Sequence, residues 1–191
     1  IFQEHRRPIY ALAVDGSGLI ASGDSGGRIF LWRLDDVQTL DLASRFTADR
    51  NSPVTPFVEL DGHANAVRGL SFSVRRAIGD DRLRLVSAGD DNMLRVFDIS
   101  DRPHLWKEVR GHGGRVRGCF VFSEGGQLLS VSHDETLRLW NLDGYQEQRV
   151  FQRLAGHDDE VLAATFGPNQ SVFSASRDRT VAGWDLATGE L

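Results

Sequence analysis

Short runs in which apolar and polar residues alternate recur along the whole chain, and Gly, Asn and Asp residues separate them. Residues 83–89 (LRLVSAG), 136–142 (TLRLWNL) and 171–177 (SVFSASR) are of this kind. A period of two residues, bounded by turn-forming residues, predicts β-strands. No run has the sustained 3.6-residue apolar spacing of a helix. The pattern therefore predicts an all-β chain of short antiparallel strands.

The same set of residues recurs four times. An aromatic residue follows a serine by ten residues in each case: Ser22 and Trp32, Ser87 and Phe97, Ser130 and Trp140, Ser174 and Trp184. Upstream of these serines lie the histidines His5, His63, His112 and His157. From each histidine, apolar positions at +4 and +9 align without a gap. Four occurrences in register divide the chain into four units of roughly 48 residues.

Each unit is expected to form four short antiparallel strands. The first strand follows the histidine and the second precedes the serine. The third strand contains the aromatic residue, and the fourth precedes the next histidine. Residues 56–60 (PFVEL), 105–109 (LWKEV) and 149–154 (RVFQRL) represent the last kind. The units are placed at about residues 5–60, 61–109, 110–154 and 155–191, with 1–4 as a leftover outer strand.

The spacing of Gly156-His157 and Trp184-Asp185 resembles the WD-repeat family of β-propellers, whose repeats have about 40–45 residues. The resemblance covers essentially the whole chain. It implies an all-β propeller of four-stranded antiparallel blades, with four WD-type blades present. We expect an arc of a seven- or eight-bladed ring, with a closed four-bladed ring as the alternative. The remaining blades would come from the same longer chain or from a second copy.

The resemblance also gives the Ser, His and Asp residues a structural role. Residues 130–141 (SVSHDETLRLWN) hold Ser, His and Asp within five residues, as a nucleophilic enzyme would need. In WD-repeat blades, however, the Trp indole donates to the Ser, the Ser bonds the His, and the His bonds an Asp in a tight turn. A constellation that occurs in every unit is what a scaffold needs, so we expect no catalytic residue.

The implied networks differ between units. The last two are complete: His112, Ser130, Asp134 and Trp140, and His157, Ser174, Asp178 and Trp184. The second has His63, Ser87 and Asp91, but Phe97 replaces Trp. The first has His5, Ser22 and Trp32, but Gly26 occupies the Asp position, which leaves open whether Asp24 substitutes.

Composition narrows the choice of partners. The net charge of −5 and a pI near 5.7 disfavour nucleic acid and anionic membranes, and no apolar run is long enough for a membrane span. The network histidines are 45 to 58 residues apart without metal-ligand spacing, so we expect no metal and no cofactor. The single cysteine, Cys119, favours a reducing compartment and a cytoplasmic location.

We therefore expect a non-catalytic protein–protein interaction scaffold. The alternative is a regulatory or sensor propeller of a larger enzyme, with a kinase, protease or nucleotide-binding domain outside this segment. The resemblance implies that the Gly-His loops and the Asp turns share one contact face, where His133 is expected to be exposed. Candidates for binding a protein or peptide there are Arg6, Asp90, Arg115, His133, Asp158, Glu160 and Arg177. Their mixed charges favour a patterned protein surface over a polyanion.

Two insertions interrupt the repeats. Residues 35–56 follow the third strand of the first unit, and residues 73–83 lengthen the link between the first two strands of the second. Both links are expected to emerge on the face opposite the Gly-His loops. They are solvated loops or a second docking surface.

Overall fold

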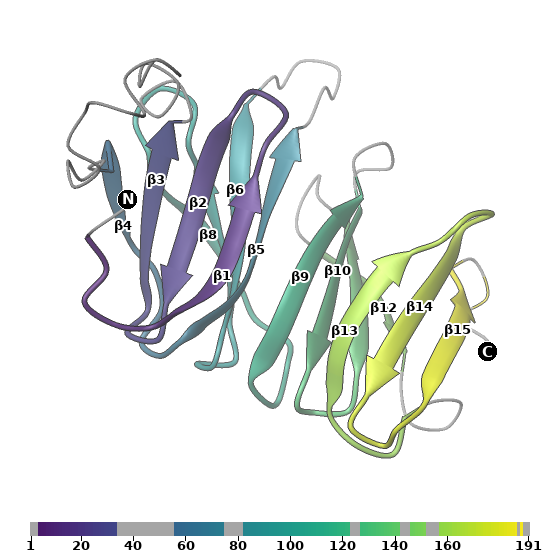
Figure 1. The fold of residues 1–191 in the computed structure, drawn as a ribbon. Helices are drawn as coiled ribbons and strands as arrows, with labels where there is room; N and C mark the ends of the chain where they lie inside the picture. Colours follow the sequence, from purple (N-terminus) through teal and green to yellow (C-terminus); the bar gives the residue numbers. More distant parts are fainter. Residues whose placement is uncertain are drawn as a thin grey trace, which may run out of the picture.

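The structure is a computed structural model that describes residues 4–33, 56–74, 82–122, 127–141, 146–151, 157–186 and 188 (Figure 1). All regular structure in these ranges is β-strand, arranged as four antiparallel sheets. The sheets are called blades 1 to 4 in chain order. The all-β prediction is confirmed.

The strands follow one another across each blade in sequence order. Blade 1 contains β1 (Ile9–Val14), β2 (Leu19–Asp24), β3 (Arg28–Arg33) and β4 (Val58–Asp61). Blade 2 contains β5 (Val67–Val74), β6 (Leu83–Gly89), β7 (Leu94–Asp98) and β8 (His104–Val109). Blade 3 contains β9 (Val116–Phe122), β10 (Gln127–Ser132), β11 (Leu137–Asn141) and β12 (Gln146–Phe151). Blade 4 has three described strands, β13 (Val161–Phe166), β14 (Ser171–Ser176) and β15 (Val181–Asp185).

A tight turn joins the second and third strands of each blade at the same relative position. One residue of this turn has a positive φ in every blade: Gly27 (92°), Asn92 (67°), Glu135 (67°) and Arg179 (74°). Glycine and asparagine enter this left-handed region readily, whereas Glu135 and Arg179 do so at a conformational cost. The turn therefore holds the network aspartate in place even where its sequence is unfavourable.

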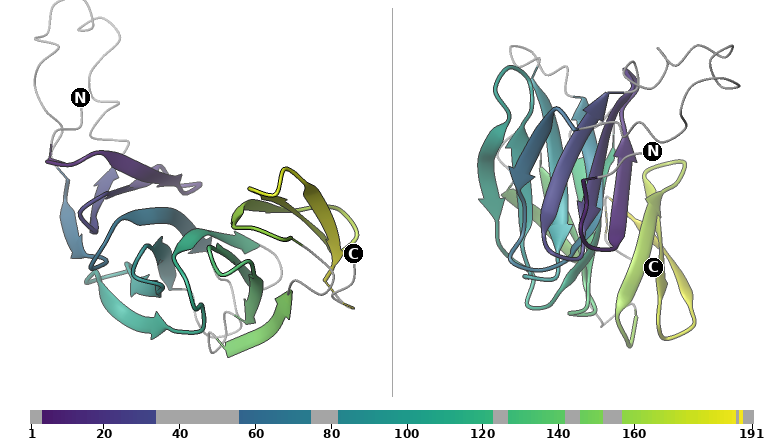
Figure 2. Two further views of the ribbon diagram at one scale, coloured as in Figure 1. Left: turned by 90° about the horizontal axis from the view of Figure 1, so that it is seen from below. Right: turned by 60° about the vertical axis from the view of Figure 1, so that its left-hand side comes forward.

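Neighbouring blades pack face to face along an arc (Figure 2, left). Alternate residues of one strand face opposite sides, so Leu85 packs toward blade 1 while the adjacent Val86 packs toward blade 3. Each of the three interfaces has its own cluster of buried apolar side chains, represented by Ile29 with Leu85, by Leu94 with Leu128, and by Leu137 with Val172. Every inner blade is thus stabilised from both sides, which explains why its strands are apolar on both faces.

Blades 1 and 4 do not pack on each other, because Leu12 of blade 1 and Val181 of blade 4 are both exposed. The four blades are therefore an arc of a propeller, as expected, and the closed four-bladed ring is not formed. Of the expected outer strand at residues 1–4, only Glu4 lies within the described residues.

The two insertions leave the blades at one end. We call the end of the blades where His5, His63, His112 and His157 lie the histidine-bearing end. The strands β3 and β5 both run away from this end, so the chain leaves them at the opposite end, beside the β1–β2 turn. Residues 34–55 and 75–81, which make up most of the insertions, lie outside the described residues.

Candidate functional site

Blade 3 contains a chain of four hydrogen-bonded side chains. The Trp140 indole donates to Ser130 Oγ at 2.8 Å, and Ser130 Oγ lies 2.7 Å from His112 Nε2. His112 Nδ1 lies 2.9 Å from Asp134 Oδ2. Because Ser130 accepts the indole proton, its own proton goes to Nε2, which leaves Nδ1–H to donate to the carboxylate. Blade 4 repeats the chain through Trp184, Ser174, His157 and Asp178, with distances of 2.7, 2.8 and 2.8 Å.

The network aspartates are held ionised. Burial opposes ionisation of Asp134, but hydrogen bonds from His112, Thr136 and the Gly113 backbone outweigh it and hold its pKa below the usual range. The Thr136 hydroxyl donates to Asp134 at 2.6 Å. Thr180 does the same for Asp178, also at 2.6 Å, and lowers the pKa of that carboxyl. The sequence did not lead us to include these threonines in the networks, although the Asp-x-Thr spacing in both turns was an available signal.

Blade 1 completes its network with Asp24. His5 Nδ1 lies 2.9 Å from Asp24 Oδ2 and His5 Nε2 lies 2.7 Å from Ser22 Oγ. The Trp32 indole donates to the same hydroxyl at 2.8 Å. The second oxygen of Asp24 accepts the backbone N–H of Gly26 at 2.8 Å. The question left open by the sequence is therefore decided in favour of Asp24.

The network of blade 2 has different hydrogen-bond partners from the other three. Its histidine keeps both contacts, because His63 lies 2.7 Å from Asp91 Oδ1 and 2.8 Å from Ser87 Oγ. Phe97 offers no donor, so Ser87 accepts no indole proton; its hydroxyl lies 3.5 Å from the Arg95 carbonyl oxygen, which can accept from it. The Arg95 guanidinium donates to Asp91 at 2.6 Å and to Glu108 of β8 at 3.0 Å. The available signal was the arginine eight residues after the network serine, which recurs only in blade 3, where Arg138 lies 3.9 Å from Asp134.

Burial and charge keep this second network in a defined ionisation state. Burial lowers the pKa of His63, and the neighbouring Arg95 adds to that effect against the pull of Asp91. Burial opposes ionisation of Asp91, but hydrogen bonds from His63 and Arg95 outweigh it and hold its pKa well below the usual range. Asp91 therefore stays an anion between a buried imidazole and a guanidinium.

Among the described residues, the serine, histidine and aspartate of each network are engaged with one another within their blade. In three blades the serine accepts a Trp N–H and is buried, and its histidine is held between serine and aspartate. Among the side chains that the structure describes, no three His, Cys, Asp or Glu residues group so that they could hold a metal ion. Within the same ranges, no helix has the length and apolar character to span a membrane.

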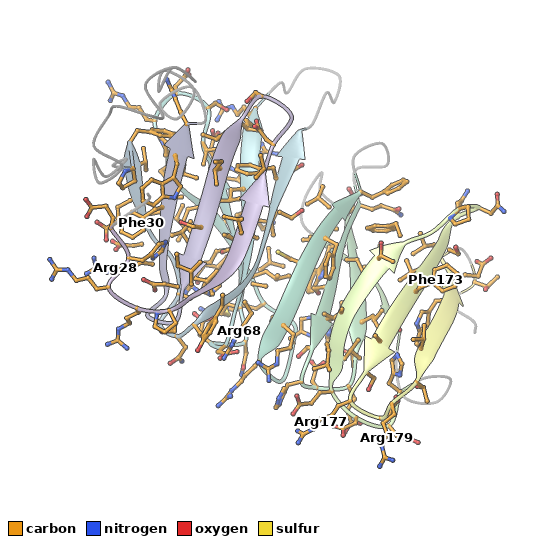
Figure 3. All side chains as sticks on the ribbon, viewed as in Figure 1. Arg28, Phe30, Arg68, Phe173, Arg177 and Arg179 are labelled. Carbon is orange, nitrogen blue, oxygen red and sulfur yellow. The ribbon has the colours of Figure 1, made fainter. Side chains whose placement is uncertain are left out.

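A second polar cluster crosses from blade to blade on the histidine-bearing end, and we call it the charged ladder. Its members are Arg68, Asp90, Arg117, His133, Glu160 and Arg177. Arg68 binds Asp90 at 2.7 Å within blade 2, and Arg117 of blade 3 approaches the same carboxylate at 3.9 Å. Figure 3 shows Arg68 and Arg177 at the same edge of the molecule, at the two ends of the ladder.

Glu160 is the junction between blades 3 and 4. Its carboxylate lies 3.5 Å from Arg117 and 3.2 Å from Arg177, and it also pairs with His133. His133 was expected to be exposed in its turn, and this was wrong: it is half-buried because it reaches across to the neighbouring blade. A contact between blades cannot be read from the local sequence of either turn.

The other predicted interface residues differ in exposure. Arg6, Arg115, Asp158 and Arg177 are exposed, whereas Asp90 and Glu160 are largely buried in their ion pairs. The sequence did not lead us to include Arg68 and Arg117 among the predicted interface residues. Each lies five residues after its histidine on an innermost strand, and this shared spacing was the available signal.

A hollow of about 280 Å³ lies at the blade 1 side of the ladder. It is lined by Tyr10, Ser25, Asn65, Ala66, Arg68, Asp90 and Arg115. The Arg68 guanidinium stacks 4.5 Å from the centre of the Tyr10 ring. Asp90 Oδ1 and Arg117 Nε are buried and have no hydrogen-bond partner within the described residues. The hollow therefore combines an aromatic face with cationic groups and the carboxylate of Asp90.

The repeated blades and their networks define a WD-repeat protein. The family model for the WD domain, G-beta repeat, matches residues 54–98, 104–141 and 148–185. The chain belongs to this WD40 repeat family, whose propellers are generally not catalytic. Of blade 1 only β4 lies within the three matches; β1, β2 and β3, with the network histidine, serine and aspartate, lie outside them, although they have the same network geometry with the aspartate displaced.

Several known proteins are similar to this chain. The human WD repeat and SOCS box-containing protein 1 is 34% identical over 127 residues, covering 66% of this chain and 25% of that protein. The nuclear distribution protein nudF 1 of Talaromyces marneffei is 31% identical over 134 residues, covering 68% and 27%. The ribosome biogenesis protein WDR12 homolog of Oryza sativa subsp. japonica is 26% identical over 162 residues, covering 69% and 37%. The chain thus spans between a quarter and two fifths of these relatives.

A solved structure has the same fold. The computationally designed Ika8 protein matches all of this chain with a TM-score of 0.72 and 23% identity. The match takes up 49% of the Ika8 chain. At this level of identity the similarity concerns the fold alone.

Proposed function

We propose that the chain is a non-catalytic protein-interaction module and that a protein or peptide docks on its histidine-bearing end. The observation that carries the proposal is the charged ladder, which joins side chains of three blades into one mixed-charge array. Ion pairs that cross between neighbouring blades hold these charges in place, so little conformational entropy is lost when a partner binds. The alternation of sign favours a partner with a matching pattern of charges over a polyanion.

The hollow beside the ladder supports the same location. Arg115 stands exposed at the rim and can receive a carboxylate of the partner. The Tyr10 ring adds apolar contact area of the kind that is enriched at protein interfaces.

Charge reversal tests the location of the interface. Arg115→Glu and Arg177→Glu should each weaken the complex between the full-length protein and its partner, captured by crosslinking and identified by mass spectrometry. The matched control is Arg102→Glu, because Arg102 is an exposed arginine at the opposite end of blade 2. Unchanged binding by both test variants, together with loss in the control, would contradict the proposal and move the interface to the face of the insertions.

A regulatory propeller within a larger enzyme is the second candidate. It is favoured by the lengths of the relatives, since this chain spans only 25% of a human protein whose name joins WD repeats to a SOCS box. The complete open reading frame distinguishes the two candidates. A catalytic domain next to the blades would support the regulatory role, whereas its absence would support a separate scaffold.

We also propose a cytoplasmic location. Cys119 is the single cysteine of the chain and a free thiol buried between blades 2 and 3, so the chain has no internal disulfide, which is typical of proteins in reducing compartments. Fractionation of cells that express the full-length protein would test this. Recovery in a secreted or periplasmic fraction would contradict it.

A further inference from the structure

The hollow beside the charged ladder is lined by several hydrogen-bond donors that have no acceptor. It lies between the blade 1 turn that contains Ser25, the blade 2 loop that contains Asn65 and the blade 3 loop that contains Arg115. The side chains of these three residues form no hydrogen bond or ion pair with any described residue. A hydroxyl, an amide and a guanidinium group therefore remain available to a ligand at this place.

Arg68 is a fourth donor, and its neighbours fix its orientation. Its Nε and Nη2 both donate to Asp90 Oδ2, at 3.0 and 2.7 Å. Its guanidinium also stacks on the half-exposed Tyr10 ring, 4.5 Å from the ring centre. The third nitrogen, Nη1, has no hydrogen bond to a described residue. Because the plane of the guanidinium is held from two sides, Nη1–H is ready to donate without reorganisation.

The carboxylate of the hollow is already engaged. Asp90 Oδ2 accepts both bonds from Arg68, and Asp90 Oδ1 faces Arg117 of blade 3 at 3.9 Å. It is therefore not available to Arg115, Asn65 or Ser25. An acceptor that comes from outside the chain would complete this set of donors.

The net charge of the hollow distinguishes between anions. Its lining contains the guanidinium groups of Arg68 and Arg115 and the carboxylate of Asp90, which leaves one positive charge. A carboxylate, with a single negative charge, balances it. A phosphate ester carries nearly two negative charges at neutral pH and would leave one of them uncompensated. The charge of the hollow thus favours a carboxylate.

The size and surroundings of the hollow fit a side chain of a larger partner. Its volume of about 280 Å³ lies below the usual range of small-molecule pockets, about 300–1,000 Å³. On the blade 1 side, the Arg7 side chain lies over Gly26, the residue after Ser25. On the other side the ladder continues through His133 and Glu160. A partner segment therefore meets charged groups before and after the hollow, as an internal residue requires and a chain terminus does not.

We propose that the hollow binds the carboxylate of a Glu or Asp side chain of the partner. Arg115 and Arg68 Nη1 donate to its oxygens, and the exposed part of the Tyr10 ring contacts its methylene groups. The inference rests on the proposed function and adds which residue type the partner presents at this place.

NMR of the guanidinium groups in the full-length protein tests the carboxylate site with amino acids whose main-chain ends are capped by acetyl and methylamide groups. Capped glutamate should shift the Nε–H signals of Arg68 and Arg115 saturably. Capped glutamine differs by the charge alone and should bind at least about tenfold more weakly. Arg115→Gln should lose the response, whereas Arg102→Gln, at an exposed arginine of the opposite end, should keep it. Equal binding of both probes would overturn the proposal.

Two further probes test the charge and the source of the carboxylate. Capped phosphoserine should bind the wild-type protein no more tightly than capped glutamate, and Asp90→Asn should shift the preference toward phosphoserine by adding one positive charge. A wild-type preference for phosphoserine would overturn the proposal. N-acetylglycine offers a main-chain carboxylate, and tighter binding of this probe than of capped glutamate would overturn the assignment to a side chain.

The inference and the proposed function can fail separately. Weakened partner binding by Arg115→Glu, with no binding of capped glutamate, would leave the interface in place and overturn the carboxylate site. Binding of capped glutamate, with partner binding unchanged in both Arg115→Glu and Arg177→Glu, would support the site and overturn the proposed interface.

Discussion

His5 of blade 1 binds Asp24, with 2.9 Å between Nδ1 and Oδ2, although Asp24 lies only two residues after the network serine Ser22. In the other three blades the aspartate lies four residues after the serine. The same hydrogen-bonded chain is thus built from a different position of the turn. The position of the aspartate in the turn matters less than the placement of its carboxylate beside the imidazole.

Replacing this carboxylate should destabilise blade 1. Asp24→Ala leaves His5 and the Gly26 N–H without their acceptor in a buried site, so we expect unfolding to become easier by about 1–3 kcal/mol. Urea unfolding followed by fluorescence measures this. Asp61→Ala, an exposed aspartate of the same blade, is the control and should change stability little. Equal losses in both variants would contradict a role for the Asp24 network.

The Trp140 indole should contribute through its N–H and not only through its size. Trp140→Phe removes the donor to Ser130 and should cost about 1–3 kcal/mol of unfolding free energy, including the smaller volume of the ring. Trp106→Phe is the same change at an exposed indole and should cost less. Catalytic readouts offer a further check, because a Trp140 variant of normal stability that lost a measurable turnover would contradict the structural role.

Stability should fall in two steps on acidification. The pKa of His63 in the folded protein lies below its ordinary value of 6.5, so its contribution is present above pH 6.5 and is lost as the pH falls from there. The pKa values of Asp91 and Asp134 lie below the ordinary 3.8, so their contribution is lost only as the pH falls below that value. Urea midpoints measured across this range should show both steps. His63→Asn should remove the first step, whereas His104→Asn, at an exposed position, should keep it.

The left-handed turn residue of blade 4 is a site where stability can be gained. Arg179 has a φ of 74°, and its side chain is exposed. Arg179→Gly removes the steric cost of this conformation and should raise the unfolding free energy by up to about 1 kcal/mol. Arg179→Ala removes the same side chain but keeps the Cβ, so it should bring no comparable gain. Equal gains from both substitutions would assign the effect to the arginine charge instead of the backbone.

Much of the fold could be predicted from the sequence because it is encoded locally and repeated. The ten-residue spacing between serine and aromatic residue places both on adjacent antiparallel strands, as Ser130 and Trp140 show. The alternation of apolar residues specifies strands, and four copies in register make chance agreement negligible. The complete networks of blades 3 and 4 were predictable for the same reason.

Tertiary structure alone decided how departures from the repeat are accommodated. Asp24 reaches His5 because the turn brings it there, and Arg95 stands beside His63 because β7 lies next to the turn that carries Asp91. Neither outcome follows from spacing, since the partners come from different strands.

The sequence by itself determined the blades, because hydrogen bonding between successive strands and the period-two apolar pattern are local properties. Only the tertiary structure decided what lies between blades. His133 meets Glu160 and Arg117 meets Asp90 because two blades face each other at a fixed angle. The exposure of Leu12 and Val181 likewise depends on whether a neighbouring blade is present, and not on the residues themselves. Burial is a property of the packed assembly, so identical repeat positions can be core in one blade and surface in another.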